Sequence, residues 1–343
     1  MRASLGQRCA GLLLAAMLAA PAAQAWGPVG HRTVGAIADQ LLKGSKVQQQ
    51  LAALMLPGET LASLANWADC PKGNFCGPLT AEMQTYLAGN PQHNNYHFID
   101  IPLKQGRYQA GLPGAHDDNI VLILQQAISV LQGRPAPNPH QFTKRQALLL
   151  LVHLVGDIHQ PLHVGAFYAA EEGGAMGAPG QFDPLGGSNY LLDETMLQEA
   201  SARLLPPRLG EEPPDSAMVR ATRSMHAFWD STAVDYAMRR HGVRSAEQFA
   251  TALIDTKGAL APKAGDASTW PVQWADEALL ACSRAYAGVI PGKMERRTSK
   301  KGSQYGVWKL DLPADYPVTS ATIASEQIQR AGYRLAAVLS AIL

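Results

Sequence analysis

Hydrophobic residues recur at helical spacing in several long segments of the chain. Apolar side chains three and four residues apart form one face of an α-helix, whereas strict alternation indicates a strand. The helical pattern covers Val34–Leu42, Asn119–Leu131, Lys144–Gln160, Met218–Arg239, Ala246–Leu260, Ala275–Ala287 and Thr322–Leu343. Alternating runs are short and few, so the pattern predicts an all-α fold.

Two stretches lack this periodicity and are predicted to be long loops. Ala169–Ser188 is rich in glycine and alanine, and Leu205–Asp215 is rich in proline. The chain has no internal repeat. We therefore expect residues 26–343 to form a single, mostly helical domain with long loops.

The first residues have the features of a secretory signal peptide. Arg2 and Arg8 give a positive start, Ala10 to Ala20 is apolar, and Ala23-Gln24-Ala25 is a small-x-small cleavage site. The apolar run is too short to span a bilayer. We expect cleavage after Ala25, which leaves 318 of the 343 residues. The mature protein should be secreted or periplasmic, monomeric and not membrane-bound.

Composition and charge narrow the function classes. With 47% hydrophobic residues, the chain can bury a large core. Loss of Arg2 and Arg8 changes the formal charge from +1 to −1, so the composition predicts no basic surface for nucleic acid. A polyanionic substrate must then be held by discrete positive charges such as metal ions.

Three cysteines remain after cleavage, because Cys9 leaves with the signal peptide. Cys70 and Cys76 are close enough to form a small disulfide loop in an oxidising compartment, which leaves Cys282 over. A Cys70–Cys282 disulfide is equally compatible with the sequence.

Chemistry-bearing residues concentrate in Leu148–His163, which reads LLLLVHLVGDIHQPLH. His153 and Asp157 are four residues apart and so share one face of this apolar helix. Pro161 ends the helix, and His163 follows it. Burying an imidazole and a carboxylate among leucines is costly, and a metal ion compensates for both. The alternative is that His153 and Asp157 form a hydrogen bond with each other in the core and bind no metal.

The same four-residue spacing recurs at His226 and Asp230 in the sequence HAFWD. Two such pairs on two apolar helices indicate a dinuclear metal site built from facing side chains, as in helical bundles. Asp69 in NWAD and His97 in YHFID are further candidate ligands.

Signal cleavage creates a third candidate metal-binding element, Trp26–His31. A free Trp26 amine and its own carbonyl oxygen can close a five-membered chelate ring, and His31 is near enough to add a ligand. The metal must displace a proton from the amine, whose ordinary pKa is about 7.7–8.0. Alternatively, Trp26 is an aromatic anchor.

Together these motifs resemble the single-strand-specific zinc nucleases of fungi, plants and bacteria, the S-one/P-one nucleases. The motifs are WGxxGH, NWAD, HFID, HxxxDxxxxxH and HAFWD, and they run in order from Trp26 towards the C-terminal helix. That family shares its helical fold with bacterial phosphatidylcholine-cleaving phospholipase C. The resemblance implies a trinuclear zinc site surrounded by long loops.

The resemblance also implies a ligand set for three Zn²⁺ ions. The first ion is bound by Asp69, His97, His153 and Asp157, and the second by His163, His226 and Asp230. The third is bound by the amine and carbonyl of Trp26 and by His31, with Asp157 bridging the first and third ions.

Two further residues are expected to act in catalysis. Asp69 can orient the attacking hydroxide as well as bind the metal, and the resemblance implies that Lys72 occupies a position where the family places a cation on the phosphate. The alternative for Lys72 is a solvated loop lysine.

The resemblance implies that Phe98 stacks on the terminal base and that Asp100 accepts hydrogen bonds from the edge of that base. If this segment is extended, the two side chains project to one side; the alternative for Phe98 is core packing. Where many members carry Gly-Gly-Asn, this chain has Gly186-Gly187-Ser188-Asn189. Either Ser188 or Asn189 then takes the substrate contact.

We therefore expect a zinc-dependent endonuclease and 3′-nucleotidase. Its substrates are single-stranded DNA and RNA and 3′-nucleotides, and its products carry 5′-phosphates. The alternatives are a zinc phospholipase C on the same scaffold and a non-catalytic zinc-binding protein of the envelope.

Overall fold

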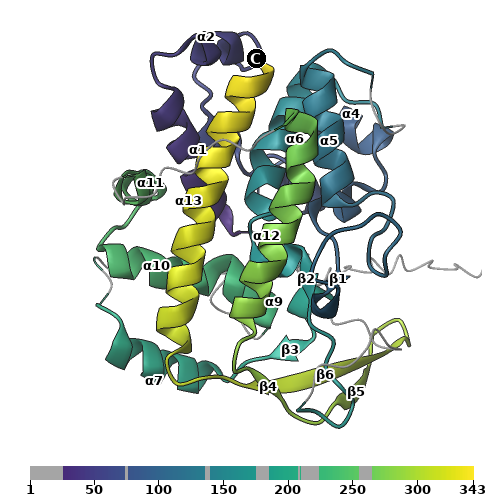
Figure 1. Cartoon of the computed structure of the whole chain (residues 1–343), viewed down its shortest axis with the longest axis vertical. Helices are drawn as coiled ribbons and strands as arrows, with labels where there is room; N and C mark the ends of the chain where they lie inside the picture. Colours follow the sequence, from purple (N-terminus) through teal and green to yellow (C-terminus); the bar gives the residue numbers. More distant parts are fainter. Residues whose placement is uncertain are drawn as a thin grey trace, which may run out of the picture.

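The computed structural model describes residues 26–73, 76–135, 140–174, 185–207, 209, 224–254 and 265–343. Helices dominate these residues, which confirms the predicted all-α class (Figure 1). Their α-helices are α1 Pro28–Leu42, α2 Lys46–Ala52, α3 Leu61–Leu64, α4 Ala81–Gly89, α5 Ile120–Leu131, α6 Lys144–Asp157, α7 Glu194–Leu204, α9 Met225–Ala227, α10 Ala233–His241, α11 Ala246–Ile254, α12 Trp270–Ala285 and α13 Tyr316–Ile342.

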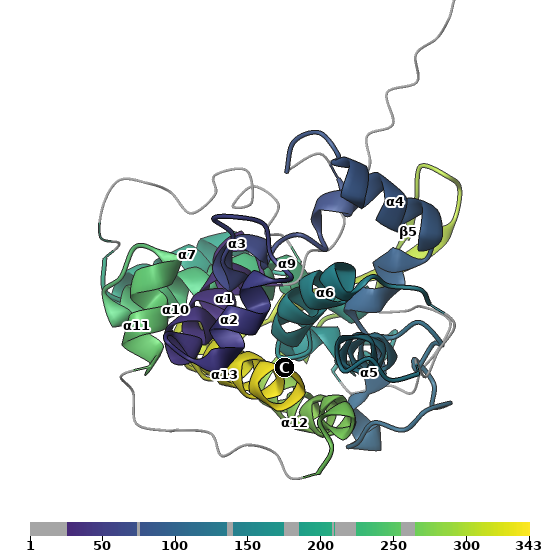
Figure 2. The same cartoon turned by 90° about the horizontal axis from the view of Figure 1, so that it is seen from above.

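The long C-terminal helix α13 organises the core. It has 27 residues and so is about 40 Å long at about 1.5 Å per residue. It packs against α1, α10 and α11 on one side and against α6 and α12 on the other (Figure 2). At Gly332, an added Cβ would lie 2.4 Å from Cβ of Ile37, so glycine is what allows α13 to approach α1 closely. Most of the large apolar side chains of these helices belong to one buried cluster.

The strands of the described residues form two small sheets. β1 Ile101–Pro102 pairs in parallel with β2 Gly165–Ala166. The second sheet lies at the lower end of the molecule in Figure 1 and contains β3 Tyr190–Leu191, β4 Ile290–Pro291, β5 Glu295–Thr298 and β6 Gln304–Asp311. β6 pairs in parallel with β3 and antiparallel with β4 and β5. Periodicity did not reveal the β5–β6 hairpin, because all four residues of β5 are exposed and polar.

Two predicted helices differ from the structure close to the candidate ligands. α6 ends at Asp157, so the predicted extension to Gln160 is wrong. Gln160 precedes Pro161 and is extended, with ψ 119°, because proline disfavours the helical conformation in the residue before it. In the predicted segment Met218–Arg239, residues 218–223 lie outside the described residues. The described part is α9, a π-helical turn η6 Phe228–Thr232, and α10.

The cysteines resolve the disulfide alternatives. Cys70 and Cys76 form a disulfide, which excludes the Cys70–Cys282 pairing. Cys282 is free and buried, and its thiol donates to the carbonyl oxygen of Gly165 at 3.3 Å. Among the described residues, no helix combines the length and the apolar character needed to cross a bilayer. The predicted signal peptide, most of the proline-rich loop and the middle of the loop 169–188 lie outside the described residues.

Candidate metal centre

Three groups of buried histidine and aspartate side chains come from α1, α6 and α9 and from the short helical turns η1 Cys70–Lys72 (with Asp69 directly before it), η2 His93–His97, η4 Pro161–His163 and η6. Within each group, one nitrogen or oxygen atom from every side chain lies within 4.8 Å of the others. The groups are His31, His153 and Asp157; Asp69, His97 and His153; and His163, His226 and Asp230. The structure thus brings together every predicted side-chain ligand.

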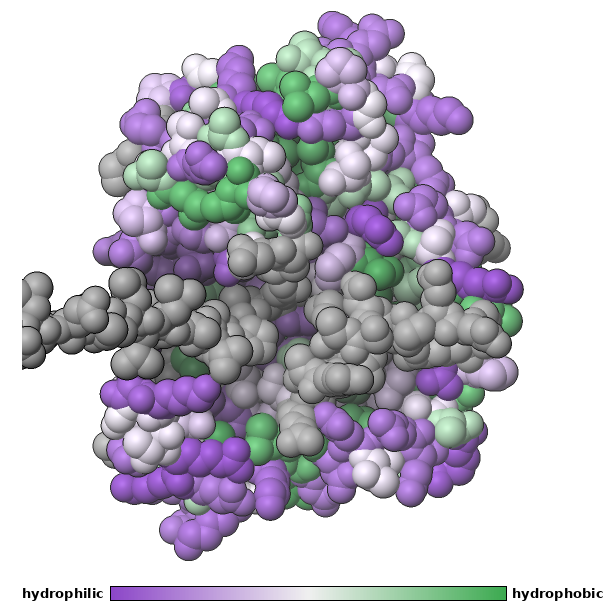
Figure 3. Space-filling view, turned by 180° about the vertical axis from the view of Figure 1, so that it is seen from behind, coloured by the Kyte–Doolittle hydropathy of each residue, from purple (hydrophilic) through white to green (hydrophobic). Residues whose placement is uncertain are grey.

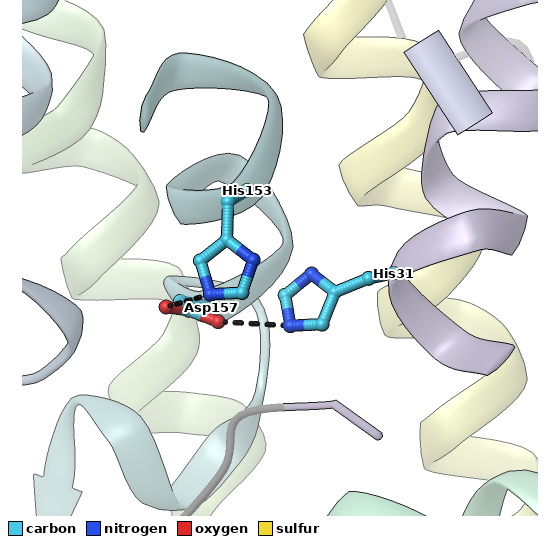
Figure 4. Close-up of side chains that lie close together, drawn as sticks. All are labelled: His31, His153 and Asp157. Carbon is cyan, nitrogen blue, oxygen red and sulfur yellow. Dashed lines mark ion pairs between the residues drawn. The ribbon is translucent and has the colours of Figure 1, made fainter. Parts of the chain in front are cut away.

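Asp157 joins the first two groups. Its Oδ1 lies 3.1 Å from Nε2 of His31, and its Oδ2 lies 3.1 Å from Nε2 of His153 and 2.8 Å from Nδ1 of His97. Figure 4 shows His31 reaching from α1 towards His153 and Asp157 of α6. Gly156 makes this approach possible, because an added Cβ would lie 2.7 Å from Nδ1 of His31.

Backbone carbonyls orient three of the imidazoles. Nδ1 of His153, His163 and His226 each contacts a carbonyl oxygen, and a carbonyl can only accept a hydrogen bond. Each Nδ1 therefore carries a proton, so in the neutral imidazole the lone pair on Nε2 is directed into the cluster. This is the arrangement of metal-binding histidines. The accepting carbonyls belong to Ala65, His97 and Gly186, at 2.7, 2.8 and 2.8 Å respectively.

The centre has more negative than positive charge. Burial and the charges of Asp69 and Asp157 raise the pKa of the Asp230 carboxyl well above its usual range. Burial alone lowers the pKa of His153, but the charges of Asp157 and Asp69 override that effect and raise it to about 10. Without a cation, the centre therefore draws in a proton. Divalent cations supply the missing charge, so the donor set fits bound metal ions.

Gln160 is a supporting residue that the sequence analysis missed. It is fully buried; its amide nitrogen donates to Oδ1 of Asp230 at 2.7 Å, and its Oε1 accepts from the Leu162 N–H at 2.6 Å. This leaves Oδ2 of Asp230 directed towards Nε2 of His226, 3.5 Å away. The available signal was a glutamine directly before Pro161, between the candidate ligands Asp157 and His163.

His159 lies within the same motif and belongs to none of the three groups. Its Nδ1 donates to the carbonyl oxygen of Val155 at 2.7 Å, and its Nε2 accepts from Arg334 of α13 at 2.8 Å. Arg334 in turn pairs with Glu277 of α12. His159 therefore connects the end of α6 to the scaffold helices, in agreement with its omission from the predicted ligands.

Trp26 is fully buried. The N–H of the next residue, Gly27, donates to the carbonyl oxygen of Asp230 at 2.6 Å. Gly30 packs on the tryptophan, since an added Cβ there would lie 2.8 Å from Cβ of Trp26. The backbone at Trp26 is thereby fixed next to η6, which carries Asp230.

Lys72 is held at the centre and is not a solvated loop lysine. Its Nζ lies 2.7 Å from Oδ1 of Asp69, and its side chain is 4% exposed. η1, which carries Lys72, begins at Cys70 of the Cys70–Cys76 disulfide. The structure thus places a cation beside the carboxylate that the sequence analysis assigned to the attacking hydroxide.

The predicted base-binding segment is extended, as its interpretation required. Phe98 has φ −152° and ψ 173° and is partly exposed, whereas Ile99 is buried. The N–H of Ile99 donates to the carbonyl oxygen of His163 at 2.8 Å, which ties this segment to η4. The Phe98 ring contacts His116 edge to face, with 5.3 Å between ring centroids. Asp100 is buried.

Along the chain, Ser188 and Asn189 lie between Gly186, which contacts the candidate ligand His226, and strand β3 of the second sheet. Ser188 is partly exposed, whereas Asn189 is buried and its carbonyl oxygen accepts from the N–H of Trp308 in β6 at 3.1 Å. Two residues before Ser188, the Gly186 carbonyl orients His226. The turn 186–189 therefore links the metal centre to β6.

Comparison with known proteins gives a consistent result. A sequence profile described as S1/P1 Nuclease matches residues 26–178 and 215–343. The match starts at Trp26 and leaves out residues 179–214, which contain Ser188 and Asn189. Nuclease S1 of Aspergillus oryzae is 24% identical over 324 residues, 92% of this chain and 91% of that relative.

Two plant proteins are also similar. Endonuclease 4 of Arabidopsis thaliana is 24% identical over 337 residues, 92% of this chain and 89% of the relative. Endonuclease 2 of the same plant is 27% identical over 193 residues, which span 55% of this chain and 61% of the relative.

Proposed function

Because the chain belongs to the S1/P1 nuclease family and is a hydrolytic, metal-dependent nuclease, we propose that it is a zinc-dependent endonuclease and 3′-nucleotidase. It cleaves single-stranded DNA and RNA and leaves 5′-phosphates. The observation that carries the proposal is the set of three buried ligand groups, two of which are joined by Asp157, with the cation of Lys72 beside Asp69. Residues 1–25 are a signal peptide, and the mature enzyme is a secreted or periplasmic monomer.

The donor set suits three zinc ions. Imidazole nitrogen and carboxylate oxygen are preferred zinc ligands. One ion is held by Asp69, His97, His153 and Asp157, and a second by His163, His226 and Asp230. A third is held by His31, Asp157 and the amine and carbonyl of Trp26. When bound, zinc supplies positive charge for the phosphoryl oxygens and lowers the pKa of water.

The chain's own residues bind and orient the substrate. Lys72 presents its ammonium group to a phosphate oxygen, and Asp69 orients the attacking water. Phe98 stacks on a base, and Asp100 accepts a hydrogen bond from the edge of that base. Ser188, which is the more exposed residue of the pair Ser188 and Asn189, contacts the substrate. A stacking platform requires an unpaired base, so single strands are favoured over duplexes.

The first test compares substrates in the mature, metal-loaded protein. We expect turnover of a single-stranded oligonucleotide and of 3′-AMP, none of phosphatidylcholine, and loss of both activities on chelation, with recovery on adding zinc. Hydrolysis of phosphatidylcholine without nucleotide turnover would instead identify a phospholipase C. Zinc binding without any turnover would identify a zinc-binding protein.

Phe98→Ala tests the stacking assignment. Stacking of a base on an aromatic ring contributes about 1–3 kcal/mol, so kcat/KM for an oligonucleotide should fall by about 5- to 150-fold. A base-free phosphodiester measured on the same preparation is the control, and its hydrolysis should be unchanged. Equal losses on both substrates are incompatible with base stacking.

A further inference from the structure

The β5–β6 hairpin carries an uneven share of the positive charge. Residues 293–309 contain one acidic residue, Glu295, and six basic ones: Lys293, Arg296, Arg297, Lys300, Lys301 and Lys309. Their formal charge is +5, although residues 26–343 together have a charge of −1. The other residues of the mature chain therefore have a formal charge of −6. Because these two charges nearly cancel, the net charge of the chain did not indicate that residues 293–309 are basic.

These basic side chains are not needed for packing in the core. Every residue of β5 is exposed, and so are Lys300 and Lys301 in the turn between the strands. Hydrophilic side chains gather at this end of the molecule, at the lower left of Figure 3. The hairpin therefore presents its charge to solvent.

Existing ion pairs hold four of the cations only weakly. Lys293 pairs with Glu172 at 3.1 Å and Arg296 with Glu171 at 3.2 Å. Glu295 is shared by the two others, Arg297 at 3.0 Å and Lys309 at 3.4 Å. The side chains in these pairs are 43% to 81% exposed, and such surface pairs contribute about 0–1 kcal/mol. When the charges of Glu171 and Glu172 are added to those of residues 293–309, the sum is still a formal charge of +3.

Backbone hydrogen bonds connect the hairpin to the candidate centre. Trp308 of β6 donates to the carbonyl oxygen of Asn189 at 3.1 Å, and β6 pairs in parallel with β3 directly after it. The Gly186 carbonyl, three residues before Asn189, orients His226. From Trp308, β6 runs outward to Gln304 over about 13 Å, at about 3.3 Å per residue. The hairpin is therefore joined through the turn 186–189 to His226 of the centre, and its cations are distributed over a length that spans several phosphates of a strand.

We propose that residues 293–309 bind the phosphates of a nucleic acid strand outside the nucleotide that is cleaved. This inference rests on the proposed nuclease function and adds a binding surface for long substrates. Nucleic acid is favoured over an anionic membrane, because residues 293–309 include no exposed large hydrophobic side chain. Basic segments that bind membranes usually combine their charge with apolar residues that insert.

The test removes the two cations of the turn in the mature, metal-loaded enzyme. Lys300→Gln/Lys301→Gln is compared with the native protein and with Lys43→Gln/Lys46→Gln, a matched pair of exposed lysines at the end of α1 and the start of α2. Each variant is assayed on a single-stranded 20-mer and on 3′-AMP between 50 and 200 mM salt. All four lysines are exposed, so folding should be unaffected.

The hairpin variant should lose kcat/KM on the 20-mer at low salt through a higher KM, with 3′-AMP turnover unchanged. Each phosphate contact on a single strand contributes about −0.7 to the slope of log affinity against log salt. The slope should therefore become shallower by about 1.4, so the defect shrinks about 7-fold between 50 and 200 mM salt. The control pair should behave like the native protein.

Three results would overturn the proposal. Unchanged kinetics and salt slope on the 20-mer would show that the hairpin does not bind the strand. Loss of binding to phosphatidylglycerol vesicles, with normal cleavage of the 20-mer, would assign the hairpin to a lipid surface. If the native enzyme hydrolyses neither the 20-mer nor 3′-AMP, the proposed function fails, and this inference fails with it.

Discussion

Replacing Asp157 by asparagine is expected to reduce nuclease activity at least about 1,000-fold and to release metal from the protein. Losing a residue that only supports a metal ligand reduces activity about 10- to 100-fold. The loss should be larger here because Asp157 is itself a proposed ligand. Its two oxygens face His31 on one side and His153 and His97 on the other. Replacing the carboxylate by an amide should therefore weaken the binding of two of the proposed zinc ions.

The charge balance gives the physical reason. Burial raises the pKa of the Asp157 carboxyl, but contacts with His153, His31 and His97 override that effect and hold it well below its usual range. The side chain is therefore ionised and supplies a negative charge that an amide lacks. An asparagine also presents an N–H₂ group to one neighbour, where a metal ion needs a lone pair.

Metal content and thermal stability should be measured together with activity. A ligand that binds only the folded state raises the unfolding temperature, so added zinc should stabilise the native protein far more than Asp157→Asn. Asp39→Asn is the matched control. Asp39 is a half-buried carboxylate outside the three groups that accepts from the N–H groups of Leu61 and Ala62. Full activity and full zinc content in Asp157→Asn would disprove the shared centre.

The parts of the centre that share one helix were predictable from sequence. His153 and Asp157 lie one turn apart on α6, so their spacing alone placed them on one face. The break at Pro161 was also readable, although α6 ends earlier than its apolar pattern suggested. Asp69 and His97 lie on separate short turns, and no periodicity relates them to α6. Their assignment came from family resemblance.

Other features depend on tertiary contacts that a sequence does not display. Gln160 looks like any polar residue beside a proline until Asp230, seventy positions later, is placed at 2.7 Å. The hairpin was hidden twice: β5 has no apolar face, and its charge cancels in the sum over the chain. Net charge describes the whole molecule, whereas a polyanion responds to local clusters of cations.

Blocking the amino group of Trp26 is the second change with a large expected effect. A protein with two extra residues, glycine and serine, before Trp26 should bind two zinc ions instead of three and lose at least about 100-fold in activity. The extension turns the amine into an amide, whose nitrogen lone pair is delocalised into the peptide bond and is a poor ligand. His31 and Asp157 then remain as an incomplete shell for the third ion.

Residues added before Trp26 are also expected to disturb the position of the Trp26 backbone, in addition to blocking its amine. Trp26 is fully buried, and the Gly27 N–H is bonded to the Asp230 carbonyl at 2.6 Å, so the backbone cannot shift to accommodate added residues. Zinc per protein should be counted by mass spectrometry for the mature and extended forms. The same two residues added after Leu343 control for the extension itself, and proteolytic removal of the N-terminal pair should restore the third ion and the activity. Three zinc ions and normal turnover in the extended form would instead make Trp26 a buried anchor, and a donor other than the Trp26 amine would then complete the site of His31 and Asp157.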